Sequence, residues 1–173
     1  MDHSLLNLRS QLRFYKYYHY NTTNVLIHSV FVPTILFSSL SILHGVPLPG
    51  GWSLSHLVSL LFSAFYILLY LPSGLVAAAI LALFNASIDN RWVDLSGGRD
   101  WVLFSLGWIM QFIGHGAFEK KRPAVLDNLV QSLVTAPYFI LFELFFLLGF
   151  MPTLKRQLDA DVKEMRTARG ESR

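Results

Sequence analysis

Five apolar segments run along this 173-residue chain, and they restrict its fold more than any other feature. The segments cover residues 25–43, 54–71, 75–86, 101–113 and 134–151. A helix needs about 20 apolar residues to cross a bilayer core of about 30 Å, and the longer segments approach that length. Charged residues make up only 14% of the chain, against about 25% in soluble domains. We therefore predict that lipid surrounds much of the protein.

The distribution of basic residues predicts how the chain is oriented in the membrane. Arg9, Arg13 and Lys16 precede the first apolar segment, and a second basic group follows Thr153. Short cytoplasmic flanks of membrane helices are rich in Lys and Arg. Both termini are therefore expected in the cytosol, which requires an even number of crossings.

These constraints predict an all-α, polytopic helical membrane protein with about four crossings. Five apolar segments break the even count, so we expect one of the two short segments, 75–86 or 101–113, to be re-entrant or fused with a neighbour. Residues 1–155 are expected to form a single helical membrane domain, and 156–173 a basic cytosolic tail. Such a tail binds either nucleic acid or anionic headgroups. Because no nucleic-acid-binding motif accompanies it, we expect the lipid bilayer as its partner and no nucleic acid.

The first 20 residues do not resemble a signal peptide, since they have no apolar h-region and no small-residue cleavage site. Leucines alternate there with basic residues and are followed by a cluster of tyrosines. This pattern is typical of an amphipathic helix at a membrane interface. We expect 1–20 to be such a lead-in to the first apolar segment.

The chain has no cysteine, which excludes disulfides, thiolate metal sites and a catalytic thiol. A metal ion would have to bind to histidine nitrogens and to carboxylate, amide or water oxygens. Such ligands suit iron(II), zinc or manganese. Two histidines and a carboxylate that leave open positions suit oxygen chemistry at iron(II).

The stretch 108–131 carries an unusual number of polar side chains for so apolar a chain. Gln111, His115 and Glu119 are spaced by four residues, which places them on one face of a helix. His115 and Glu119 can then reach one ion from successive turns. The alternative is that Glu119 forms a surface ion pair with the basic residues that follow it. The residue before a proline avoids the α region, so we expect the helix to end at Arg122.

His28 lies about one turn inside the first apolar segment, with Asn24 four residues before it. One interpretation is a structural histidine that donates to a backbone carbonyl, and the other is a metal ligand or proton shuttle, because ionisable groups in membranes usually face a cavity. His19 can join His28 only if a helix begins between them. Residues 21–24 (Asn-Thr-Thr-Asn) are a plausible start, since Asn and Thr are good N-caps. His3, His44 and His56 are expected to be solvated or interfacial.

Glu143 interrupts the last apolar segment. A lone carboxylate in hydrocarbon is costly, so it needs a partner. We expect that partner to be a histidine, Arg91 or Arg122, or a hydrogen bond between helices.

The two polar blocks resemble a known family. The first is Y-x-x-Y-H-x(4)-N-x(3)-H-x(4)-P, and the second spans residues 111–143. Together they resemble the fungal 2-hydroxy-fatty-acid dioxygenase family over roughly residues 10–155, with the region 43–101 unmatched. Val32 stands where the family usually has glycine. The first block consists of Tyr15, Tyr18, His19, Asn24, His28 and Pro33.

The resemblance implies an enzyme of the endoplasmic-reticulum membrane that acts in phytosphingosine breakdown. It implies that iron(II) and dioxygen cut a 2-hydroxy fatty acid to a chain one carbon shorter, without 2-oxoglutarate. The family's essential histidines fall on His19, His28 and His115, and we add Glu119 as a possible ligand or supporting residue. The expected substrate contacts are Asn24, Gln111, Lys120, Arg122, Asp127 and Gln131.

The competing hypothesis is a non-catalytic lipid-binding or scaffold protein, whose polar residues hold helices together. A transporter is a weaker alternative, because no inverted repeat is visible, and a hydrolase with another metal remains open. Convergence separates these hypotheses. Three histidines that meet within a few ångströms indicate a metal site, whereas histidines on separate faces indicate helix packing.

Overall fold

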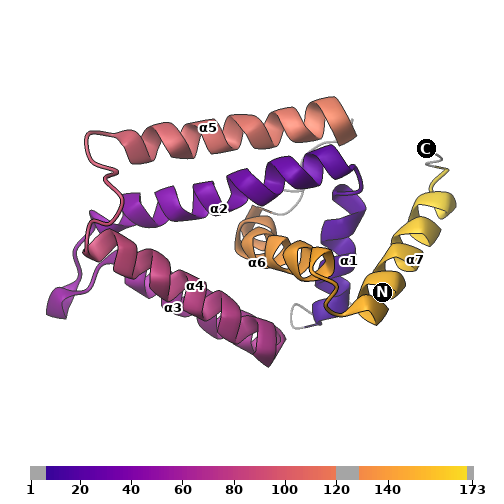
Figure 1. Cartoon of the computed structure of the whole chain (residues 1–173), viewed down its shortest axis with the longest axis horizontal. Coiled ribbons are helices and arrows are strands. Elements are labelled where there is room, and N and C mark those ends of the chain that lie inside the picture. The colour runs from indigo at the N-terminus through magenta and orange to yellow at the C-terminus, as the bar shows by residue number, and fades with distance from the viewer. Residues whose placement is uncertain (1–6, 120–128, 171–173) are drawn as a thin grey trace. The chain divides into compact units, whose positions relative to one another are not determined.

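The computed structural model describes residues 7–119 and 129–170, with only the backbone of 129–132. Within these ranges the chain forms seven α-helices, one 3₁₀ turn and one π-helical turn (Figure 1). The described residues contain no β-strand, only a single bridge between Pro47 and Ser53. The predicted all-α class is confirmed. By its contacts the chain divides into two compact units, one of residues 1–29 and 112–173 and one of residues 30–111.

The first unit is built around α1 (Leu8–Tyr18), which packs against α6 (Leu129–Leu147) and α7 (Pro152–Ala168). Leu12 and Tyr15 of α1 are buried. Arg9 holds α7 through a two-pronged ion pair with Asp161, at 2.9 and 3.0 Å. The amphipathic lead-in is thus a helix whose apolar side covers α6 and α7, while its position at a membrane interface remains a prediction. The predicted basic tail begins inside α7.

The second unit contains a hairpin of α3 (Leu54–Leu69) and α4 (Leu71–Asp89) (Figure 1). Only Tyr70, in an extended conformation, separates the two helices. The sequence analysis left residues 72–74 out of the apolar segments 54–71 and 75–86, but they lie in the first turn of α4. Proline fits there because no N–H bond is lost in the first turn of a helix. A Cβ on Gly74 would lie 2.5 Å from the Tyr66 carbonyl oxygen, so glycine permits this tight turn.

The same unit contains most of α2 (Thr22–His44) and nearly all of α5 (Arg99–Ile113). A Cβ on Gly107 would lie 2.4 Å from Cγ1 of Ile35, so α5 approaches α2 closely at this glycine. α2 is followed by a 3₁₀ turn, η1, at Pro49–Gly51.

Among the described residues, three helical segments are long and apolar enough to cross a membrane: Thr22–His44, Leu71–Asp89 and Arg99–Glu119. A fourth is possible if α6 and α7, bent by 116°, count as one broken span. Residues 75–86 and 101–113, which were expected to be short, belong to helical segments of 19 and 21 residues, because both continue into polar sequence. That one of them is re-entrant remains a prediction. The shorter apolar helix is α3.

The helices expose many large apolar side chains. In the most apolar 18-residue stretch of each of these three segments, only 22% to 28% of the residues are buried. Leu68 is 70% exposed and Val102 is 66% exposed. Exposed apolar surface on this scale marks contact with lipid or with another protein. Together with the segment lengths, it agrees with a polytopic membrane protein.

Candidate metal centre

The junction between α1 and α2 brings two histidines to one side of the first unit. α1 ends at Tyr18, and His19 is its C-cap. The side-chain oxygen of Asn21 accepts from the backbone N–H of Thr23 at 2.9 Å, which caps the start of α2. The predicted helix start between His19 and His28 is therefore confirmed, and the change of chain direction allows both side chains to point inward.

The third histidine comes from far along the sequence. His115 lies in a π-helical turn, η2 (Gly114–Glu119), that continues α5. Short π-helical segments occur frequently at functional sites. A Cβ on Gly114 would lie only 2.3 Å from Oδ1 of Asn24, so the absence of a side chain at Gly114 lets η2 approach the first turn of α2.

His19, His28 and His115 converge. Their ring centroids are 4.5 to 4.8 Å apart, and one nitrogen from each lies within 4.8 Å of the other two. All three side chains are buried, with 3% to 6% of their surface exposed. Histidines that only hold helices together need no such convergence, so this geometry disfavours the scaffold hypothesis.

Hydrogen bonds fix the tautomers of two of the three rings. Nδ1 of His19 donates to the Tyr15 carbonyl at 2.8 Å, and Nδ1 of His28 donates to the Asn24 carbonyl at 2.9 Å. A carbonyl only accepts, so the proton is on Nδ1 and the lone pair on Nε2. Metal-binding histidines usually donate their other nitrogen to a carbonyl or carboxylate in this way. The Tyr15 ring also stacks on His19, with 3.9 Å between centroids.

The spacing of the nitrogens suits a metal ion. Nε2 of His28 and Nε2 of His115 are 3.1 Å apart. Two nitrogens held about 2.1 Å from one ion, with about 95° between the bonds, lie about 3.1 Å apart. Nδ1 of His115 is buried and has no hydrogen-bond partner among the described residues. The donor set is therefore compatible with a divalent transition metal.

Burial keeps His19 uncharged. It lowers the pKa of His19 well below the usual 6.5, and the neighbouring His28 and His115 lower that pKa further. Only a neutral imidazole binds a metal, so His19 is ready to act as a ligand at neutral pH.

Glu119 supports the α1–α2 junction. Its Oε1 accepts from the backbone N–H groups of Tyr20 and Asn21, both at 2.9 Å, and from Nδ2 of Asn24 at 3.1 Å. Its Oε2 is buried and has no hydrogen-bond partner in the described part of the chain. The carboxylate lies outside the group of three ligand nitrogens. Glu119 as a fourth ligand remains a prediction.

The other predicted site residues have different outcomes. Asn24 is fully buried and touches the site through Glu119 and His28. Gln111 is also buried but belongs to the second unit, so its role toward substrate remains a prediction. Three further predicted contacts, Lys120, Arg122 and Asp127, lie outside the described residues. The expected helix end at Arg122 and the side chain of Gln131 lie outside them too.

Glu143 has a partner that the sequence did not indicate. Its Oε1 lies 4.0 Å from Nζ of Lys16 on α1. Neither a histidine nor Arg91 pairs with Glu143 among the described residues, and Arg122 lies outside them. The contact with Lys16 joins two helices, and no local pattern predicts it because it depends on how α1 packs against α6.

A second cluster of possible metal ligands lies in the second unit and consists of His44, His56 and Asp89. Here the tautomer is the opposite one. Nδ1 of His56 accepts the backbone N–H of Ser53 at 3.2 Å, so the proton is on Nε2, which donates to Asp89 at 3.2 Å. A protonated nitrogen cannot bind a metal. This cluster is therefore a hydrogen-bonded network at the ends of α2, α3 and α4.

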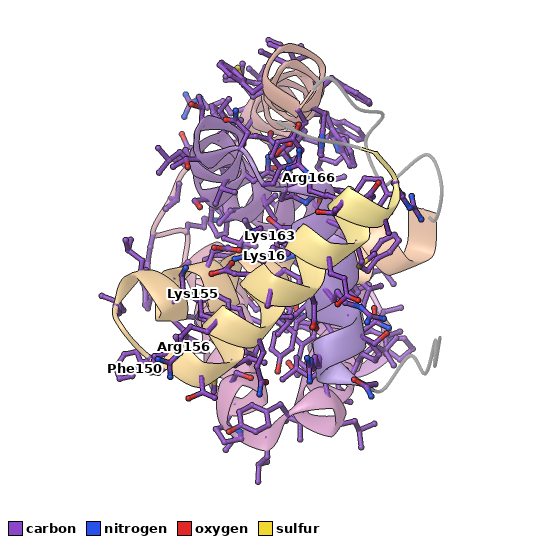
Figure 2. All side chains as sticks on the ribbon, turned by 90° about the vertical axis from the view of Figure 1, so that its right-hand side faces the viewer. Lys16, Phe150, Lys155, Arg156, Lys163 and Arg166 are labelled. Carbon is purple, nitrogen blue, oxygen red and sulfur yellow. The ribbon has the colours of Figure 1, made fainter. Side chains whose placement is uncertain are left out.

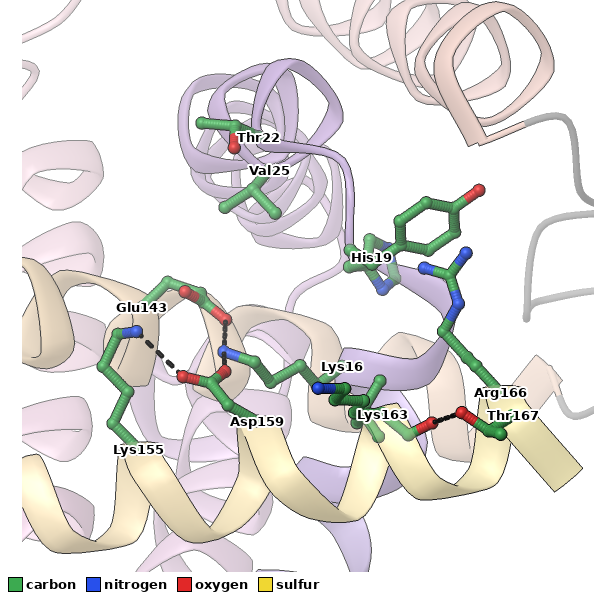
Figure 3. Close-up of a pocket in the computed structure, with 12 residues that line it drawn as sticks. Lys16, His19, Thr22, Val25, Glu143, Lys155, Asp159, Lys163, Arg166 and Thr167 are labelled. Carbon is green, nitrogen blue, oxygen red and sulfur yellow. Dashed lines mark hydrogen bonds and ion pairs between the residues drawn. The ribbon is translucent and has the colours of Figure 1, made fainter. Parts of the chain in front are cut away.

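The first unit also contains an open pocket of about 660 Å³, with His19 in its lining (Figure 3). Most of the other lining residues come from α7, among them Lys163 and Arg166. The sequence analysis assigned these residues only to a basic tail. Their position beside His19 depends on the packing of α7 against α1, for which the sequence carries no specific signal.

Two comparisons relate the chain to known proteins. The family model described as "Mpo1-like: 2-hydroxy-palmitic acid dioxygenase Mpo1-like" matches residues 5–148. The chain is 58% identical over 163 residues to the 2-hydroxy-palmitic acid dioxygenase MPO1 of Saccharomyces cerevisiae, and the match covers 94% of each protein. No solved structure matches.

Proposed function

The chain belongs to the Mpo1-like family, and on this premise we propose that it is a membrane dioxygenase that cuts 2-hydroxy fatty acids to a chain one carbon shorter. The observation that carries the proposal is the convergence of three buried histidines in one compact unit. In His19 and His28, Nδ1 is bound to a carbonyl, which puts the lone pair on Nε2. A non-catalytic scaffold needs neither feature.

His19, His28 and His115 would hold iron(II), with Glu119 proposed as a fourth ligand or as support. Bound iron(II) would activate dioxygen, and the 2-hydroxy acid itself would supply the electrons that reduce it, so no 2-oxoglutarate would be required. The carbonyls of Tyr15 and Asn24 keep two of the rings in the binding tautomer.

The surroundings of the cluster favour selective chemistry. Burial of the three rings limits their contact with bulk water, and a low water content limits side reactions in an active site. The Oε1 contacts of Glu119 hold the backbone between His19 and His28 in place. These contacts keep the ligands positioned before substrate arrives.

We also propose the cellular setting that the family resemblance implies. The protein would reside in the endoplasmic-reticulum membrane with both termini in the cytosol, and would act in phytosphingosine breakdown. Its substrates would be a 2-hydroxy fatty acid and dioxygen, with no nucleic acid partner. Asn24 and Gln111 are proposed to contact the fatty acid, together with the predicted residues of 120–131.

The test is the iron content of the purified protein and its oxygen uptake. Wild type, His115→Ala and His56→Ala would be loaded with iron(II) without oxygen and then assayed with 2-hydroxypalmitate. His56→Ala is the matched control, because it removes a histidine from the other cluster, whose tautomer disfavours metal binding.

We expect near-stoichiometric iron and release of the shortened acid in wild type and in His56→Ala. Both should be lost in His115→Ala. A fully active His115→Ala enzyme would refute the assignment of the cluster. Wild-type protein that takes up no iron would leave the scaffold hypothesis as the better account.

A further inference from the structure

The pocket beside His19 has an excess of positive charge. Its lining contains four basic side chains and only two carboxylates (Figure 3): Lys16, Lys155, Lys163 and Arg166 against Glu143 and Asp159. The pocket therefore favours an anion, and its volume lies within the range of small-molecule sites, about 300 to 1,000 Å³.

One end of the pocket is already neutralised. Nζ of Lys16 lies 2.9 Å from Asp159 and 4.0 Å from Glu143. Nζ of Lys155 lies 3.1 Å from Asp159. Figure 3 shows these four side chains facing one another at one end of the pocket. This end has no charge left over for a ligand.

The other end carries the two cations that remain. Lys163 and Arg166 have no acidic partner among the described residues. The Arg166 guanidinium instead lies over the Tyr20 ring, 3.6 Å from its centroid. Tyr20 directly follows His19, and its hydroxyl donates to the Glu119 carbonyl at 3.2 Å. A ring held in this way places the guanidinium next to the histidine cluster.

We propose that Lys163 and Arg166 bind the carboxylate of the fatty-acid substrate in the pocket that His19 lines. A guanidinium binds a carboxylate through two parallel hydrogen bonds, and its stacking on Tyr20 leaves its N–H edge free for them. The assignment rests on the proposed function, because it identifies the anion as the acid on which that reaction acts.

The position of these cations agrees with the bond that breaks. The reaction removes C1, so the carboxylate end of the substrate must lie near the histidines while the acyl chain leads away. Cations beside His19 orient the molecule in this direction. Lys163 and Arg166 are positioning residues, since their charge selects and places the acid.

The test compares acid and alcohol binding to the metal-free, full-length protein in uncharged detergent. The probes are 2-hydroxypalmitate and 1,2-hexadecanediol, which keeps the 2-hydroxyl and the chain but replaces the carboxylate. The variants are Arg166→Gln, Arg166→Lys and Lys163→Gln. Arg156→Gln is the control, because Arg156 belongs to the same helix but does not line the pocket; Figure 2 shows it near Phe150, at the other end of α7 from Arg166.

We expect wild type to bind the acid more tightly than the diol. Arg166→Gln should weaken acid binding about tenfold, the worth of one charge-assisted hydrogen bond, with a smaller effect for Lys163→Gln. Arg166→Lys should recover part of the loss, and Arg156→Gln should bind like wild type. Diol binding should be unchanged in every variant, which also shows that the variants are folded.

Several outcomes would overturn the proposal. One is unchanged acid binding in Arg166→Gln, and another is an equal loss for acid and diol. A third is an Arg166→Gln variant that no longer binds a short-chain phosphatidic acid but still binds the fatty acid, since that result would make the site a lipid-headgroup site. If wild type consumes no oxygen but still separates acid from diol through Arg166, the proposed reaction fails and the carboxylate site stands.

Discussion

Gly114 is predicted to be the most sensitive glycine of the candidate metal centre. It opens η2 where this turn meets the first turn of α2, and a Cβ there would lie 2.3 Å from Oδ1 of Asn24. The nearest neighbour is a buried side chain that itself donates to Glu119 at 3.1 Å. Gly114→Ala must therefore displace Asn24 or move η2 away from α2.

The size of the effect follows from these contacts. Overpacking of a tight interior costs about 1–3 kcal/mol. Loss of a buried hydrogen bond to a charged group costs about 1.5–3 kcal/mol. The higher helix propensity of alanine returns at most about 1 kcal/mol. The expected net loss of stability is about 3 kcal/mol, or a fall on the order of 10 °C in the midpoint of thermal unfolding.

The assay is thermal unfolding of the purified protein in detergent, together with its iron content. Gly116→Ala is the matched control, since a Cβ at Gly116 meets nothing within 4 Å although it lies two residues further along the same turn. We expect Gly116→Ala to be neutral or slightly stabilising. Gly114→Ala should lower both the midpoint and the retained iron.

A second background identifies the cause. If the clash with Asn24 is responsible, Gly114→Ala should cost almost nothing in an Asn24→Ala protein, because the obstructing side chain is gone. The coupling between the two substitutions should then be about 3 kcal/mol. Equal costs in both backgrounds would refute the reasoning, as would a Gly116→Ala variant as unstable as Gly114→Ala.

Three further predictions concern other parts of the chain. Burial lowers the pKa of His19, which is about 6.5 in an unfolded chain, so the unfolded state binds more protons below that pH. The metal-free protein should therefore lose stability as pH falls below about 6.5 and keep a constant stability from pH 7 to 8. The same fall in His19→Gln would contradict this assignment. Gly74→Ala should lower the unfolding midpoint, because its Cβ would meet the backbone of Tyr66 and Ile67 at about 2.5 Å and backbone cannot rotate away; an unchanged midpoint contradicts this. Glu119→Gln should weaken metal retention at least about tenfold in chelator competition, as loss of supporting residues around metal ligands usually does, and unchanged retention would remove Glu119 from the site.

Local signals in the sequence were sufficient to predict part of the candidate metal centre. Asn21 and the two threonines after it are typical of a helix start, and this start is what turns His19 toward His28. The cost of an ionisable group in a membrane marked His28 independently. Both arguments use only residues that are neighbours along the chain, so they do not depend on how the helices pack.

Features that depend on packing were not accessible in this way. Pro72 has the same local pattern whether it ends α3 or opens α4, and only the hairpin shows that it opens α4. The pairing of Glu143 with Lys16 depends on contact between α1 and α6. The i, i+4 spacing of His115 and Glu119 predicted one face of an α-helix, but η2 is a π-helical turn, and nothing in its sequence indicates the wider turn.

The two histidine clusters show where the chemistry of a site is decided. Both contain residues of ligand type, and both hold their ligand atoms within 4.8 Å. Proton positions separate them: carbonyls fix the proton of His19 and His28 on Nδ1, whereas a backbone N–H fixes that of His56 on Nε2. A change that keeps the three histidines but removes the carbonyl partners of His19 and His28 should therefore weaken metal binding. Residue type and spacing identify candidate ligands, and the backbone groups bonded to His19, His28 and His56 decide which ring nitrogen of each can bind.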